Sequence, residues 1–210
     1  EGDGMKTKIY LVRHARTVAN DKGILSGVTD VEVSIEGKKQ IDAFTPVFRN
    51  VKLDRIYTSP LSRTRETIAR IAQEHHLEPI VIRELIEKNN GIAETMTIDQ
   101  VDQIMPGAKV MFLPNGMLPD IEGAETLEQA QKRIVDTVLY CAKENLGNDI
   151  LICTHGFVLK LFIWKLLNRD SRKIYPNISI QNTSITTVEY DSIENKMTLL
   201  EIANCDHLKK

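Results

Sequence analysis

The chain has 210 residues, of which 42% are hydrophobic and 27% are charged, as in an ordinary globular domain. Its 27 basic and 29 acidic residues leave a net charge of −2, which gives no general attraction to nucleic acid or to an anionic membrane. No apolar run approaches the roughly 20 residues that span a bilayer. We therefore expect neither nucleic acid nor a membrane as a partner, and any anion site must be local.

The cysteines and the N-terminus bear on the compartment. Cys141, Cys153 and Cys205 form no CxxC pair, and an odd number argues against a disulfide framework. A reducing, cytoplasmic location is expected, and the N-terminus lacks the pattern of a signal peptide. We expect residues 1–4 to be an expression remnant ahead of a native start at Met5, and residues 5–210 to form a single domain.

Strand-like and helix-like segments alternate along the first half of the chain. A short apolar run at 8–12 predicts a buried strand, runs at 53–58 and 79–83 predict two further strands, and the spacing over 35–48 predicts a helix. Ser59-Pro60 predicts a helix directly after the second run, with Ser59 as its N-cap and Pro60 as its first residue.

The stretch from 84 to 123 is less regular, and within it only Thr97 to Met105 has the pattern of a helix. Loops of this length in compact domains are usually functional or disordered. We expect a small cap inserted over a site at about 88–123, and the alternative is a long surface connection.

The second half of the chain returns to the alternating pattern. Thr126 with Gln129 forms a capping-box signature, which predicts the start of a helix. Strands alternating with helices predict an α/β sandwich with a mostly parallel central sheet. The further expected elements are the rest of this helix to near Gly147, a strand at 149–154, a helix at 157–167, and a strand pair at 183–190 and 196–202.

Two of the predicted strands end in histidines, His14 and His155. In open parallel sheets, ligands bind beyond the carboxyl ends of the strands, so both side chains should face one crevice. An imidazole is a good nucleophile when one nitrogen is unprotonated and the other is held by a hydrogen bond. Arg13 adds a guanidinium fork that suits phosphate oxygens. The alternative for either histidine is a structural role in a loop or a helix cap.

The remaining candidates are an arginine and an acid. Arg63 lies near the predicted helix N-terminus, where its charge and the helix dipole could hold an anion, although a lone arginine is more often a surface charge. Glu87 is the best candidate acid, with Glu84 and Glu94 as competitors. We find no cluster of metal ligands, no G-x-S-x-G context for Ser59 or for a neighbouring serine, and no phosphate-binding P-loop.

The motifs together are more specific than their parts. Leu11 to Thr17 followed by Asn20 resembles the opening signature of the histidine phosphatase superfamily, the phosphoglycerate mutase-like proteins, in its phosphatase branch. The similarity covers about residues 9–190. It continues at Gly27, Asp30, Ser34, Gly37 and Gln40, at Thr58 to Thr64 with Thr67, at Leu85 to Gly91, at Gly123 to Thr126, at Cys153 to Gly156, and at Asn182 to Ser184.

This resemblance implies a three-layer α/β/α sandwich and a metal-independent phosphatase that acts on small phosphorylated metabolites without a cofactor. It assigns His14 as the nucleophile, which carries the phosphoryl group as phosphohistidine, and Glu87 as the proton donor. A carboxyl close to an anionic phosphate is favoured in its protonated form by like-charge repulsion. Around the phosphoryl oxygens it places Arg13, Arg63 and His155, helped by Asn20, with Thr17, Arg16 and Gly156 as further substrate-binding residues.

The sequence departs from the family pattern at Ala15, Arg16 and Thr95. Ala15 still offers a backbone carbonyl to hold the His14 ring, and Arg16 is expected to favour substrates with a second anionic group. The sequence does not determine the geometry of the cap around Thr95. The alternatives to a phosphatase are a phosphoglycerate mutase and a non-catalytic module that binds a phosphorylated ligand or a protein. The sequence leaves the oligomeric state open between monomer and homodimer.

Overall fold

The computed structural model of the chain describes residues 5–111, 120–170 and 178–209. The expected expression remnant at 1–4 and residues 112–119 of the expected cap lie outside the described residues.

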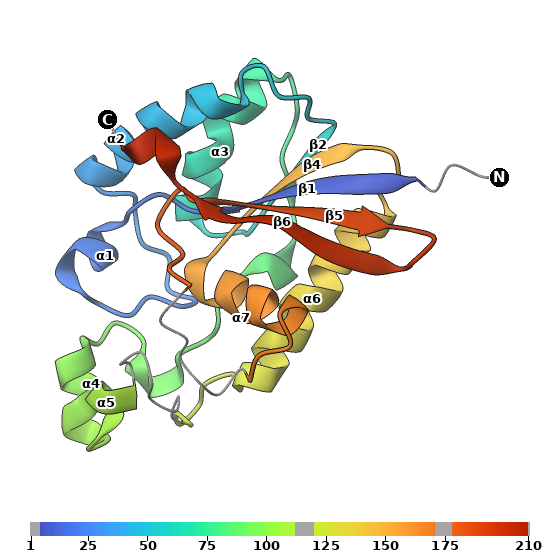
Figure 1. The fold of residues 1–210 in the computed structure, drawn as a ribbon. Helices are drawn as coiled ribbons and strands as arrows, with labels where there is room; N and C mark the ends of the chain where they lie inside the picture. The colour runs from blue at the N-terminus through green and yellow to red at the C-terminus, as the bar shows by residue number, and fades with distance from the viewer. Residues whose placement is uncertain (1–4, 112–119, 171–177, 210) are drawn as a thin grey trace.

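A six-stranded sheet forms the centre of the molecule, in the order β3-β2-β4-β1-β5-β6 (Figure 1). The four strands from β3 to β1 run parallel, whereas β5 is antiparallel to β1 and to β6. The prediction of a mostly parallel sheet is confirmed. The strands are β1 (Lys6–Arg13), β2 (Arg55–Thr58), β3 (Ile80–Val81), β4 (Asp149–Thr154), β5 (Ile185–Asp191) and β6 (Lys196–Asn204).

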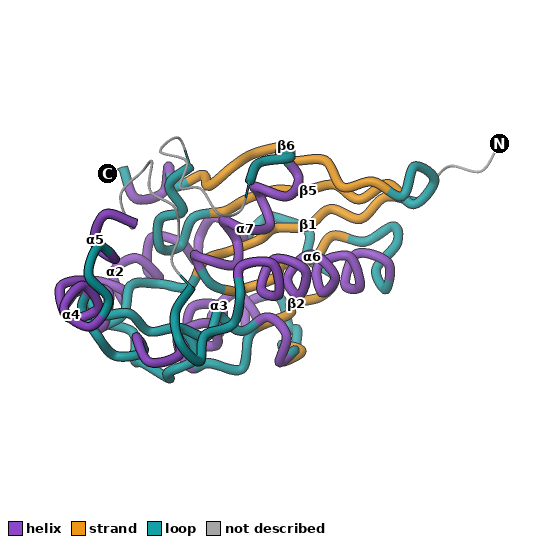
Figure 2. Tube along the Cα trace, turned by 90° about the horizontal axis from the view of Figure 1, so that it is seen from below, coloured by secondary structure: helices purple, strands orange, loops and turns teal. Residues whose placement is uncertain are grey.

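Helices cover both faces of this sheet, which gives the expected three layers. In Figure 1, α2 and α3 lie on one face and α6 and α7 on the other, and in Figure 2 α6 and α7 overlie the strands. Two further helices, α4 and α5, lie beyond one end of the sheet. The helices are α1 (Val18–Lys22), α2 (Ile35–Phe44), α3 (Ser62–Glu74), α4 (Ile98–Ile104), α5 (Ala108–Met111), α6 (Leu127–Lys143) and α7 (Gly156–Leu166), with 3-10 turns at Thr45–Phe48, Arg83–Leu85, Gly91–Ala93 and Asp206–Leu208.

The central strands are apolar on both faces, because each face packs against helices. In β4, Ile150 and Ile152 point into the core under α6 and α7, and Leu151 and Cys153 point into the core under α2 and α3. Strand β1 alternates in the same way. This two-sided burial fixes β1 and β4 side by side in parallel register, with Arg13 opposite Thr154, so that the next residues, His14 and His155, leave the sheet together.

One predicted helix boundary was wrong. Helix α3 begins at Ser62, with Leu61 as its N-cap, and not at Ser59-Pro60. The hydroxyl of Ser59 does not cap this helix, because it accepts from the Leu61 amide and is hydrogen-bonded to His155. The capping box predicted at Thr126 is present, and Thr97 forms a second one with Gln100.

Among residues 5–111, 120–170 and 178–209, no helix is long and apolar enough to cross a membrane.

Candidate active site

His14 is buried at the end of β1, and its protonation state is fixed by its neighbours. Its Nδ1 lies 2.7 Å from the carbonyl oxygen of Ala15, and because a carbonyl only accepts, Nδ1 must carry the hydrogen. Burial and the charges of Arg13 and Arg63 lower the pKa of His14 well below its ordinary value. The ring is therefore neutral near pH 7, and Nε2 keeps its lone pair for attack.

His155 lies at the end of the neighbouring strand, with its ring centroid 5.2 Å from that of His14. Its Nε2 is 2.8 Å from the hydroxyl of Ser59, and burial together with Arg63 lowers its pKa well below 6.5. The Ser59 hydroxyl already accepts from the Leu61 amide and has its proton free to donate to Nε2. The Nδ1 atom of His155 is buried without a partner in the described protein.

Arg13 contributes the first guanidinium. One terminal nitrogen donates to the carbonyl of Ile180, and burial lowers the pKa of Arg13 to about 10, so the group is still charged at neutral pH. Gly156 permits this position, since a Cβ atom at residue 156 would lie 2.8 Å from Nε of Arg13. The Arg13 Nε is itself buried without a hydrogen-bond partner in the described residues.

Arg63 contributes the second guanidinium, from the second residue of α3. Its terminal nitrogens donate to the carbonyls of Ser26, Gly27 and Thr29 at 2.7 to 2.8 Å, which ties the chain segment 26–29 to the site. The same segment is held from its other side by Glu94, which accepts from the amides of Gly27 and Val28. Glu94, a competing candidate acid, is therefore occupied in fixing this loop.

Three buried polar atoms thus lack partners at one place: Nε of Arg13, Nε of Arg63 and Nδ1 of His155. The two guanidinium nitrogens are donors, and native proteins rarely leave buried donors unpaired. Both arginines are close enough to His14 to lower its pKa. This set of donors beside an unprotonated nucleophile matches the oxygens of a phosphoryl group, which needs neutralisation and in-line positioning more than covalent help.

Glu87 lies at the N-terminus of α7, the helix that follows His155. Its Oε1 accepts from the amides of Lys88 and Val158 and its Oε2 from the amide of Phe157, at 2.9 to 3.0 Å. A carboxylate is stabilised at a helix N-terminus by such donors and by the dipole. Oε2 accepts only one of the three bonds, which leaves it a lone pair for a transferred proton. Glu84, the other candidate for the acid, is exposed and does not line the cavity beside His14.

The backbone next to Glu87 is held in place by Arg133 of α6. Arg133 donates to the carbonyls of Glu84 and Ile86, both at 2.7 Å, and forms a two-pronged ion pair with Glu125 at 2.8 and 2.9 Å. Thr154 of β4 adds a hydrogen bond of 2.6 Å to the Leu85 carbonyl. The position of Glu87 is therefore set by three elements at once.

Asn20 lines the same cavity, and its amide orientation is defined. Its Oδ1 receives hydrogen bonds from the Thr17 amide and from Nδ2 of Asn182, so its own Nδ2 is the group left to face a ligand. Asn182 also donates to the His14 carbonyl at 3.0 Å. Thr17 is fully buried as the N-cap of α1, and Arg16 is paired with Asp21 at the surface; neither lines the cavity.

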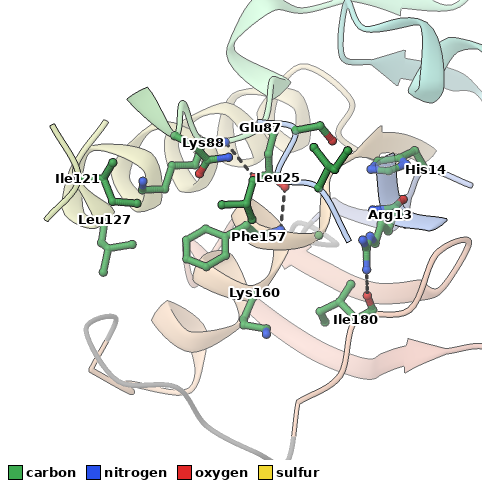
Figure 3. Close-up of a pocket in the computed structure, with 15 residues that line it drawn as sticks. Arg13, His14, Leu25, Glu87, Lys88, Ile121, Leu127, Phe157, Lys160 and Ile180 are labelled. Carbon is green, nitrogen blue, oxygen red and sulfur yellow. Dashed lines mark hydrogen bonds between the residues drawn. The ribbon is translucent and has the colours of Figure 1, made fainter. Parts of the chain in front are cut away.

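A cavity of about 290 Å³ opens beside His14 (Figure 3). Arg13, Glu87 and Gly156 lie on its wall, together with two lysines, Lys88 and Lys160. Apart from these polar groups the wall is largely apolar; its hydrophobic members are Ile24, Leu25, Ile121, Leu127, Phe157 and Ile180. The described residues hold no group of three or more His, Cys, Asp or Glu side chains placed to bind a metal ion.

The structure thus brings together the four residues expected from the strand ends and α3, and it places the expected Glu87 and Asn20 beside them. Sequence reasoning gave no part in the site to Ser59 and Asn182, which orient His155 and Asn20, or to Arg133, which fixes the Glu87 loop. It also missed Lys88 and Lys160. For Lys160 a signal existed, since it lies one helical turn beyond His155-Gly156.

Comparison with known proteins identifies the family. Residues 9–203 match the model of the histidine phosphatase superfamily, branch 1. Because this match covers most of the chain, the chain belongs to that superfamily.

Relatives of known name are similar over nearly the whole chain. Phosphoserine phosphatase 1 of Hydrogenobacter thermophilus is 26% identical, over 93% of this chain and 92% of its own length. A protein named "Probable phosphoglycerate mutase GpmB" of Klebsiella pneumoniae is 25% identical, over 87% and 85%. Among solved structures, YhfR of Bacillus stearothermophilus superposes with a TM-score of 0.87 at 27% identity, covering 96% of this chain and 99% of that one. Phosphoserine phosphatase of Entamoeba histolytica, solved with 3-phosphoglyceric acid, gives 0.82 at 26%, with the same coverage.

Proposed function

We propose that this protein is a phosphoric monoester hydrolase of the histidine phosphatase family, which works through a phosphohistidine on His14. The observation that carries the proposal is the group of three buried, unpaired nitrogens on Arg13, Arg63 and His155 beside the neutral imidazole of His14. Family membership and the phosphoserine phosphatases among the relatives support the same reaction class.

In the proposed first step, Nε2 of His14 attacks phosphorus in line with the ester oxygen. The N–P bond forms as the P–O bond breaks, and Glu87 gives a proton to the leaving oxygen. The two guanidiniums, His155 and the Asn20 amide hold the three remaining oxygens. In the second step Glu87 takes a proton from water, which attacks the phosphohistidine; inorganic phosphate leaves and His14 returns to its neutral form.

The cavity supports a small metabolite as the substrate. A volume of about 290 Å³ is at the lower end of the range for small-molecule sites. The named compounds in two related structures, 3-phosphoglyceric acid and phosphoserine, are both phosphorylated carboxylic acids. We extend the proposal to this substrate class.

Residues 88–111 and 120–123 are proposed to cap the site. Lys88, Asn90 and Ile121 contribute to the cavity wall, and the hydrophobic cluster around α4 and α5 includes Leu25, another wall residue. A reducing compartment, the cytoplasm, is also part of the proposal, and it agrees with Cys141, Cys153 and Cys205 all being free thiols.

A mutase is the alternative that a specific observation favours, since several relatives carry the name phosphoglycerate mutase. A mutase must keep the phosphoryl group on the enzyme until it is returned to the substrate, which requires exclusion of water. Product analysis separates the two: a hydrolase converts 3-phosphoglycerate to glycerate and phosphate, and a mutase yields 2-phosphoglycerate.

The test of the proposal is hydrolysis of p-nitrophenyl phosphate in EDTA, between pH 5 and 7.5, by wild type and by His14→Ala. We expect turnover that survives EDTA and is lost in the variant. Turnover that persists in His14→Ala contradicts the assignment of the nucleophile. Turnover that requires a metal ion contradicts a mechanism based on arginines and histidines.

A further inference from the structure

The cavity wall carries one cation that the proposed phosphoryl chemistry does not use. A phosphate monoester is close to a dianion at neutral pH, and the charges of Arg13 and Arg63 offset it. Lys160 lies in the first half of α7, four residues after Gly156, and lines the same cavity. Its charge is therefore in excess of what the phosphoryl group needs.

Lys160 makes no hydrogen bond or ion pair with any other described residue. The side chain is half-buried, and burial and the nearby Arg13 lower the pKa of its ammonium group. An ammonium that is partly desolvated, unpaired and next to another cation is unfavourable unless an anion joins it. The site thus selects for a ligand that brings a second negative charge.

The other nearby cations are already committed. Arg16, the residue that the sequence suggested for a second anion, forms an ion pair with Asp21 and does not line the cavity. Lys88 is buried, and its charge interacts with those of Glu125, Glu87 and Glu94. Its ammonium group also donates to the Asn89 carbonyl. Lys160 is the cavity lysine that remains available.

The position of Lys160 places this second charge on the leaving-group side. Phe157, one turn earlier on α7, holds Glu87 through its amide, and the ammonium of Lys160 lies within the electrostatic reach of both Arg13 and Glu87. In Figure 3 the side chain extends from α7 beside Phe157, on the side of Ile180. A group bound there belongs to the alcohol part of the ester, close to the phosphate.

We propose that Lys160 is the specificity-determining residue for this site, and that it binds the carboxylate of a small phosphorylated carboxylic acid. A single lysine matches one negative charge, which a carboxylate supplies and a second phosphate exceeds. This inference rests on the proposed function, because it assigns Lys160 to the substrate of the same site.

The experiment compares two substrates that differ only in the relevant group, 3-phosphoglycerate and glycerol 3-phosphate, in which a hydroxymethyl replaces the carboxylate. The measured quantity is the ratio of kcat/KM for the first to that for the second, in wild type, Lys160→Met and Lys160→Arg. We expect the ratio to fall about tenfold or more in Lys160→Met, as for the loss of one charge-assisted hydrogen bond, and to be largely restored in Lys160→Arg.

Lys165→Met is the matched control, since Lys165 is an exposed lysine of the same helix. Its ratio should equal that of wild type. An unchanged ratio in Lys160→Met, including the case in which both substrates lose activity equally, overturns the proposal.

Failure of the proposed function is distinguishable. If wild type hydrolyses neither compound, calorimetric titration measures the affinity of wild type and of Lys160→Met for each compound. The ratio of the affinity for 3-phosphoglycerate to that for glycerol 3-phosphate then replaces the ratio of kcat/KM. A tenfold fall in that ratio supports the role of Lys160 in binding, and equal ratios overturn it.

Discussion

The two ends of the candidate site are built in different ways. At the phosphate end, defined by Arg13, His14, Arg63 and His155, every side chain is held by short contacts to backbone or to a buried hydroxyl. At the leaving-group end, defined by Leu25, Lys88, Ile121, Leu127 and Lys160, the wall comes from irregular segments and helix surfaces. The residues proposed for the chemistry are thus held by defined contacts, whereas the side chains proposed to select the substrate have fewer of them.

The largest effect is expected at the phosphate end, from Arg63→Met. This change removes a buried cation beside the phosphoryl group, and we expect kcat/KM to fall about a thousandfold. Arg65→Met is the control, because Arg65 is an exposed arginine of the same helix. Thermal unfolding checks that the variant is folded, since Arg63 also holds the segment 26–29. A folded variant with nearly wild-type kcat/KM would contradict the role of Arg63 in binding the phosphoryl group.

Glu87→Gln tests the boundary between the two ends. The amide cannot donate the proton that an alkoxide leaving group needs, so kcat for an alkyl phosphate should fall about a hundredfold. The loss should be much smaller with p-nitrophenyl phosphate, whose leaving group is stable as an anion. Equal losses with both substrates would contradict a role for Glu87 as the proton donor.

Arg133→Met loosens the Glu87 segment without touching the cavity wall. Because Arg133 binds the carbonyls of Glu84 and Ile86, we expect kcat for an alkyl phosphate to fall about tenfold through misplacement of Glu87. A positioning role predicts a smaller loss with p-nitrophenyl phosphate, which a general loss of structure would not produce. Lys132→Met, at an exposed position of the same helix, is the control.

A separate effect concerns stability at low pH. The pKa values of His14 and His155 are lowered in the folded protein, chiefly by burial, so below about pH 6.5 the unfolded chain binds more protons than the folded one. The free energy of unfolding should therefore fall as pH drops from 7 to 5, by at most about 1.4 kcal/mol per pH unit for each histidine. His155→Asn should reduce this slope. A slope that His155→Asn leaves unchanged would contradict the neutral state of His155.

Sequence reasoning reached the phosphate end because that end is encoded locally. Arg13-His14 and His155-Gly156 directly follow two apolar strands, and parallel pairing of those strands brings them together. The resemblance to a known family then selected Glu87 over Glu84 and Glu94, which chemistry alone left open. The start of α3 was misplaced because Ser59 has the pattern of an N-cap, whereas its hydroxyl is bound to a histidine that lies 96 residues away.

The leaving-group end could not be predicted in the same way. Leu25, Ile121 and Lys160 meet there from segments without a common motif, and which of them face the cavity depends on the path of loops. Arg133 shows the same limit, because its partners are backbone carbonyls 47 and 49 residues earlier, which no sequence pattern specifies.

The most direct test of the account is to trap the phosphoenzyme. Wild type is mixed with a phosphate monoester, quenched within milliseconds in alkali, and mapped by mass spectrometry, with His14→Asn as the control. The account predicts a base-stable, acid-labile phosphoryl group on His14 that forms and decays at rates compatible with turnover and is absent in the variant. Turnover without any such intermediate, or a phosphoryl group on a residue other than His14, would contradict it.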